Sequence, residues 1–194
     1  YELTNSGQAG QETSHFIDLA RDLSAINRRL YRQGRAYHVR KVTFISKNTE
    51  NSGVPDPGGN RISISTAPDS WMVRGAWKRG FELWNKQRKD AIAMTNVKPG
   101  TYDDFKIHLS DDGRGATKLV PLDNGGNALS LGEWNYVTMV TPDGTTGADN
   151  FALHLLGDHV GTSGALSSVG LVKSYGESRT TVNSIEPNVP ATMS

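Results

Sequence analysis

The residues best suited to chemistry in this sequence are cations that crowd one stretch near its start. Residues 21–41 contain a single acid, Asp22, and seven basic side chains: Arg21, Arg28, Arg29, Arg32, Arg35, Arg40 and Lys41. Such a cluster neutralises phosphate groups largely without sequence preference, and its binding weakens steeply as salt is added. The alternative is that these residues form a solvated helix face. We predict that the seven side chains bind nucleic acid.

The charge of the chain is divided between its two halves. Residues 1–100 contain 16 Lys and Arg against 9 Asp and Glu, whereas residues 101–194 contain 5 against 11. A division of this kind predicts two electrically different faces, one of which could meet a polyanion. A second basic group lies within residues 74–89, but the sequence does not show whether the two groups share a surface.

A set of histidine and aspartate residues is the candidate for an enzyme. His154, Asp158 and His159 lie close together in the segment HLLGDH. In a strand, residues 154 and 158 share a face and residue 159 does not, so a three-ligand metal site is geometrically awkward. We therefore predict no enzyme, no catalytic residue and no resident metal, with His154 packed in a strand and the other two in a turn. The alternative is a metal-dependent hydrolase or cupin-like enzyme that uses all three.

Paired acids and tryptophans are further candidates for binding. Adjacent carboxylates at 103–104 and at 111–112 could bind Ca²⁺ at a subunit interface, although DDG is also ordinary turn sequence. Apart from that interface Ca²⁺, no cofactor is predicted. Four tryptophans could stack on a sugar or a base, but three lie on one predicted helix, where aromatic residues more often pack into a core. They are Trp71, Trp77, Trp84 and Trp134.

The elements that must position the basic residues are two helices and two strands. Apolar residues three or four apart in 13–30 predict a short helix, capped by Thr13 or Ser14, whose arginines face solvent or a ligand. Residues 36–46 and 61–66 have strand-like patterns and are expected to pair across a long loop. Residues 71–94 predict a long helix with an aromatic face and a basic back.

The second half of the chain consists of short strand-like runs with turn sequences between them. The runs are 101–109, 116–122, 133–141, 150–157 and 165–175, with a further one at 178–184. Parallel strands would need crossover helices, which are not visible, so we expect an antiparallel arrangement. The predicted fold is mainly β: an eight-stranded antiparallel jelly-roll sandwich with one long inserted helix and a short N-terminal helix. The predicted parts are a basic arm and helix (1–35), the jelly roll (36–182) and an irregular tail (183–194).

The composition excludes several classes of protein. The chain has no cysteine, which rules out disulfides, thiolate zinc sites and a cysteine nucleophile. No window approaches the roughly 18 continuous apolar residues that span a bilayer, and no apolar leader follows the first residues. We expect a soluble protein with no membrane partner.

Three segments resemble viral capsid proteins. LSAINRRLYRQGRAYHVRKVTF, at 23–44, leads from an Arg-rich stretch into a first strand and is similar to the start of the shell domain in single jelly-roll capsid proteins. SWMVRGAWKRGFELWNKQ, at 70–87, and SVGLVKSYGESRTTV, at 168–182, resemble the capsid proteins of bacilladnaviruses, single-stranded DNA viruses of diatoms that are related to nodavirus-like T=3 capsids. The resemblance extends over most of residues 20–182 and includes no catalytic motif.

The resemblance implies a structural subunit. Copies of it would assemble inside the host cell into an icosahedral T=3 virion, with the Arg-rich segment facing a packaged single-stranded DNA genome. Capsid arms of this kind are longer and more basic, which implies that Tyr1 is a processed or truncated start. The alternative is a jelly-roll carbohydrate-binding module that uses Trp71 or Trp134 with a loop Ca²⁺, and it leaves the basic segment unexplained.

Overall fold

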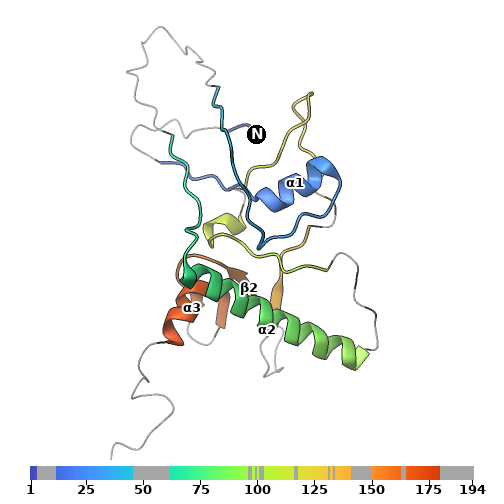
Figure 1. Ribbon diagram of the computed structural model, residues 1–194, viewed down its shortest axis with the longest axis vertical. Coiled ribbons are helices and arrows are strands. Elements are labelled where there is room, and N and C mark those ends of the chain that lie inside the picture. Colours follow the sequence, from blue (N-terminus) through green and yellow to red (C-terminus); the bar gives the residue numbers. More distant parts are fainter. Residues whose placement is uncertain are drawn as a thin grey trace, which may run out of the picture.

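The computed structural model of the chain describes residues 1–3, 12–45, 62–95, 98, 100, 103–115, 118–130, 132, 134–140, 150–162 and 165–179. The helices in these ranges are α1 (Leu19–Asn27), α2 (Trp71–Thr95) and α3 (Leu171–Glu177), with a short 3-10 turn at Asp112–Arg114. The strands are β1 (Thr138–Val140), β2 (Asn150–His154), β3 (Val160–Thr162) and β4 (Ala165–Gly170). Figure 1 shows α2 as the longest element, with α3 beside it and α1 apart from both.

The four strands form one small mixed sheet in the order β1-β2-β4-β3. β1 runs antiparallel to β2, and β3 runs antiparallel to β4. The central pair, β2 and β4, is parallel, with Leu153 opposite Val169. No crossover helix is needed, because the chain turns back through β3 before it enters β4. The expectation that all strands are antiparallel is therefore wrong.

The predicted eight-stranded jelly roll is also wrong for the part of the chain that the structure describes, which holds four strands in a single sheet. Residues 36–45 and 62–70, which contain most of the two strands predicted to pair, have no regular secondary structure, and neither joins a ladder with another described segment. Strand propensity favours an extended backbone, whereas pairing depends on a partner that is distant in the sequence. The loop 48–60, the end of the run 178–184 and the tail 183–194 lie outside the described residues.

Helix α2 spans Trp71–Thr95, which agrees with the prediction of 71–94 to within one residue. Helix α1 is shorter than the predicted 13–30. It begins after Asp18, whose carboxylate accepts a hydrogen bond from the backbone N–H of Arg21 at 3.2 Å, so Asp18 is the cap instead of Thr13 or Ser14. It ends at Asn27, and the residue that follows, Arg28, has a left-handed backbone with φ of 50°.

Helix α3 lies where the sequence predicted the continuation of a strand. The run 165–175 divides into β4 and then α3. Leu171, Val172 and Tyr175 fall on one side of a helix because residues three and four apart are neighbours there. That side packs against the apolar core, and tertiary packing therefore decides the conformation of this segment.

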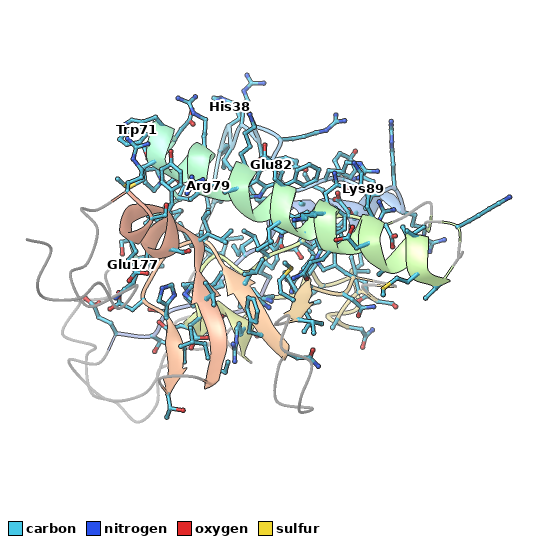
Figure 2. All side chains as sticks on the ribbon, turned by 90° about the horizontal axis from the view of Figure 1, so that it is seen from below. His38, Trp71, Arg79, Glu82, Lys89 and Glu177 are labelled. Atoms are coloured by element: carbon cyan, nitrogen blue, oxygen red, sulfur yellow. The ribbon has the colours of Figure 1, made fainter. Side chains whose placement is uncertain are left out.

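The apolar core lies between α2 and the sheet. Its buried members come from α2, from residues 105–107 and 137, from β1 and β2, and from α3; they are Ala76, Phe105, Ile107, Val137, Met139, Leu153 and Leu171. Figure 2 shows α2 lying across one face of the sheet, which holds the polar side of the helix outward. Of the helices that the structure describes, none combines the length and the apolar character needed to cross a membrane.

Candidate nucleic-acid interface

The first cation of the predicted cluster is not exposed. Arg21 is 3% exposed, and its Nε lies 2.7 Å from the Oδ1 of Asp22, which is itself 1% exposed. The guanidinium also donates a hydrogen bond to the backbone carbonyl of Leu119. The expectation that Arg21 faces solvent or a ligand is therefore wrong, and its buried pairing keeps the guanidinium away from any phosphate at the surface.

The other six cations of the cluster are exposed. Arg32 forms an ion pair with Asp104, with 2.7 Å between Nη1 and Oδ1, and keeps 44% of its side chain exposed. No ion pair with a described carboxylate occurs for the remaining five, which are Arg28, Arg29, Arg35, Arg40 and Lys41. No described carboxylate pairs with their positive charge, and such exposed positive charge attracts a polyanion.

Helix α2 carries a second group of cations on the side away from the core. The helix holds six basic residues against two acids, Glu82 and Asp90. The basic residues are Arg74, Lys78, Arg79, Lys86, Arg88 and Lys89. Three of them lie within 4 Å of a carboxylate, at 3.5 Å for Arg74, 3.9 Å for Lys78 and 2.9 Å for Arg88. Exposed pairs of this kind are weak, so a phosphate can compete for these cations.

The two basic groups adjoin at Gly34 and Trp77. Gly34 has φ of +79°, and a Cβ on it would lie 2.5 Å from the indole ring of Trp77, so only glycine lets the chain pass this close to α2. Figure 2 places His38 on the same outer side of the molecule as Glu82 and Lys89. We call these two groups, the six exposed cations of residues 28–41 and the six of α2, the basic face.

Two segments next to the basic face expose apolar side chains. Residues 36–45 and 62–66 expose large apolar side chains, including Ile45 at 89% and Ile64 at 61%. The backbone of these segments joins no ladder within the described chain. An unpaired segment with exposed apolar side chains is a ready template for pairing with another chain.

The residues considered for an enzyme do not converge. His154 lies in β2, fully buried, with its Nδ1 2.6 Å from the Ser168 hydroxyl and its Nε2 2.9 Å from the Asp158 carbonyl oxygen. Burial lowers the pKa of His154. The Asp158 carboxylate instead contacts the Lys173 ammonium, with 2.8 Å between Oδ1 and Nζ. His159 contacts Glu177, with 3.0 Å between Nε2 and Oε2. Within the described ranges no three His, Cys, Asp or Glu residues gather as a metal site would require.

Three of the four paired acids form ion pairs with arginines. Asp103 lies 2.9 Å from Arg88, and Asp104 lies 2.7 Å from Arg32. Asp111 lies 3.2 Å from Arg114. Each of these three carboxylates therefore already neutralises a neighbouring guanidinium. Interface Ca²⁺ at these positions stays a prediction.

The tryptophans differ in their surroundings. Trp77 and Trp84 pack against the core, as expected of an aromatic helix face. Trp134 is partly buried, with the Lys106 ammonium 4.7 Å from the centre of its ring. Trp71, at the first position of α2, is 58% exposed.

A polar cluster beside α1 was missed by sequence reasoning. The His108 ring stacks on Tyr136 with 4.0 Å between centroids, and the Lys118 ammonium lies 3.2 Å from His108 Nδ1. The Tyr136 hydroxyl donates to the Asp18 carboxylate at 2.9 Å. Burial lowers the pKa of His108 to about 4 and that of Lys118 to about 8. No local sequence signal marks this cluster, because its members lie at widely separated positions.

We expect the protein to lose stability as the pH falls from about 6.5 to about 4. An unfolded histidine takes up its proton near pH 6.5, whereas folded His108 resists protonation until about pH 4, so acid favours the unfolded state. His108→Gln should flatten this pH dependence in urea unfolding measured across the range, and buried His154, whose pKa is also lowered, contributes to the slope that remains. The exposed His38→Gln is the control; equal slopes in both variants would contradict the prediction.

Comparisons with protein-family models, with curated proteins and with solved structures found no match to this chain. The resemblance to bacilladnavirus capsid proteins therefore stays a prediction. The geometry supports two features on which a function can be argued: the basic face and the unpaired segments beside it.

Proposed function

We propose that the protein is the structural subunit of a viral capsid, which assembles with copies of itself and packages nucleic acid without sequence preference. One observation carries the proposal. Residues 36–45 form no helix or strand, are unpaired within the described chain and are mostly exposed, and they combine apolar side chains with the cations Arg40 and Lys41. A segment of this kind is suited to joining another subunit through its backbone while it meets phosphate with its cations.

Assembly is supported by the apolar side chains that the subunit leaves uncovered. Val39, Val42 and Phe44 are each about half exposed, and Ile45 is almost wholly exposed. The neighbouring segment adds Ile62 and Ile64. Contiguous exposed apolar residues mark interaction surfaces, and strand addition supplies main-chain hydrogen bonds. Copies of the same chain are the partner that a shell requires.

Packaging is supported by the charge of the basic face. Its twelve cations come from two parts of the chain that meet at Gly34 and Trp77. Contacts to phosphate oxygens fix position but read no sequence. The proposed ligand is therefore the backbone of a nucleic acid, and the resemblance to bacilladnavirus capsid proteins favours single-stranded DNA. The proposed location is the virion, formed in the host cell. The proposal does not depend on a jelly roll.

Assembly is tested by electron microscopy and sedimentation of the purified protein. We expect closed particles for the wild type, and mainly small species for Ile45→Asp, because a buried, unpaired carboxylate is costly at an apolar contact. Met94→Asp is the matched control, since Met94 is 88% exposed and Ile45 is 89% exposed. A wild-type protein that stays monomeric at high concentration would refute the proposal.

Packaging is tested by the salt dependence of oligonucleotide binding. A variant with glutamine at the five unpaired cations of residues 28–41 should still assemble but carry less nucleic acid. For single strands, the slope of log K against log salt should fall by about 0.7 for each phosphate that the variant no longer neutralises, or up to about 3.5 for five. A slope equal to that of the wild type would show that these cations do not bind phosphate. The two variants check each other, because Ile45→Asp removes no cation and should weaken binding by the isolated chain less than the loss of five cations does.

A further inference from the structure

Two aromatic rings and two guanidinium groups form a cluster where α2 begins and α3 ends. The ring of Trp71 meets the ring of Tyr175 edge to face, with 6.3 Å between centroids. Arg179 lies over both rings, at 5.2 Å from the centre of Trp71 and 5.5 Å from that of Tyr175. Arg79 lies over Tyr175 at 5.1 Å. Figure 2 shows Trp71 and Arg79 along α2, with Glu177 below them at the end of α3.

The spacing of residues along α2 builds this cluster. Positions 71, 75 and 79 are four apart and share one face of a helix. Gly75 lies between Trp71 and Arg79, and a Cβ there would lie 2.9 Å from the Tyr175 hydroxyl oxygen. Because glycine has no side chain, Tyr175 can occupy the space between the other two.

The cluster is not part of the core. Trp71 is 58% exposed, whereas Trp77 and Trp84 on the same helix pack against the core. Arg79 donates to the Ser178 hydroxyl at 2.5 Å, and Arg179 donates to the Tyr175 hydroxyl at 3.3 Å. Neither arginine pairs with a carboxylate of the described residues. An exposed indole is therefore flanked by two positive charges that no described acid neutralises.

We propose that Trp71, Arg79 and Arg179 form a stacking site for an unpaired base of single-stranded nucleic acid. Arg179 already lies over the indole, so a base would stack on the part of the ring that stays exposed, while the guanidinium groups hold the neighbouring phosphates. Bases in a duplex are already stacked on one another, so a duplex cannot use this site without distortion. The two positive charges favour this anionic ligand over a neutral sugar, which could also stack on the indole. This inference rests on the proposed function and adds that the nucleic acid bound at this site is single-stranded.

The test compares single-stranded and duplex DNA of about 20 nucleotides, matched in length, by fluorescence anisotropy with the full chain. Stacking contributes about 1–3 kcal/mol per base, so Trp71→Ala should weaken single-strand binding by about 5- to 150-fold. Duplex binding should stay within about twofold, because it depends on phosphate contacts. Trp71→Phe should retain most of the affinity, since it keeps an aromatic face. Leu83→Ala, another exposed apolar position on α2, is the matched control and should change neither affinity.

The outcomes separate this inference from the proposed function. If Trp71→Ala leaves single-strand binding unchanged, or weakens duplex binding equally, the stacking site is refuted while charge-based packaging stands. If a neutral oligosaccharide displaces the single strand from the wild type, the indole binds sugar and the inference is also wrong. If the wild-type chain binds neither nucleic acid, both proposals fail. Circular dichroism of each variant checks that the fold is retained.

Discussion

Phe105→Ala should lower the free energy of unfolding by about 3–5 kcal/mol. Phe105 is 1% exposed and lies at the centre of the aromatic packing of α2, with ring centroids 5.4 Å from Trp77, 5.9 Å from Phe81 and 5.8 Å from Trp84. Removing the ring forfeits its burial and leaves a cavity that three large neighbours cannot fill without moving. Urea unfolding followed by circular dichroism measures the change.

Phe44→Ala is the matched control for that experiment. It removes the same ring from a position that is 48% exposed on an unpaired segment. Under conditions where the protein is monomeric, we expect a change within about 0.5 kcal/mol, as for most surface substitutions. Equal losses of stability for the two variants would mean that the core does not lie between α2 and the sheet.

The second large effect is expected at the buried ion pair of α1. Asp22→Ala should lower the free energy of unfolding by about 3–5 kcal/mol, because it leaves Arg21 buried without its counter-charge. The Asp22 carboxylate also accepts a hydrogen bond from the Tyr1 hydroxyl at 2.7 Å, and the substitution removes this bond too. The measurement is again urea unfolding at neutral pH.

Two comparisons show whether the missing charge is the cause. Asp158→Ala breaks an ion pair of similar length, 2.8 Å, but the Asp158 side chain is 83% exposed, so stability should stay near that of the wild type. Replacing both members of the buried pair, as in Arg21→Met with Asp22→Leu, should recover part of the stability because no buried charge remains. If the double variant is no more stable than Asp22→Ala, the lost free energy of unfolding comes from packing and not from the buried charge.

The sequence predicted helix α2 better than the sheet. The aromatic spacing and turn residues around 71–94 predicted α2 almost to the residue, because both signals are local. The runs 133–141, 150–157 and 165–175 contain β1, β2 and β4. The order of these strands and the parallel central pair were not predictable from local patterns, because they depend on which distant segments pack together. The same dependence explains why part of one predicted strand became α3.

The candidate site was predicted in part. Counting charges located the cations from Arg28 to Lys41, which the structure shows to be exposed, but it wrongly included Arg21, which is buried. That these cations bind nucleic acid stays a prediction. Arg21 differs because the single acid in that stretch, Asp22, holds it in a buried pair. A count of charges does not reveal which charged side chains form ion pairs. The stacking of His108 on Tyr136 could not be predicted from local sequence, because the two residues are 28 positions apart.

Residues 105–108 serve both packed regions of the molecule. Phe105 and Ile107 belong to the apolar core, while the backbone N–H of Ile107 donates to the Gln33 side chain at 2.7 Å. The next residue, His108, stacks within the polar cluster beside α1 and also donates its backbone N–H to Leu153 of β2 at 3.1 Å. One short stretch therefore contacts both the α1 region and the sheet, so that a substitution within it should disturb both packed regions at once.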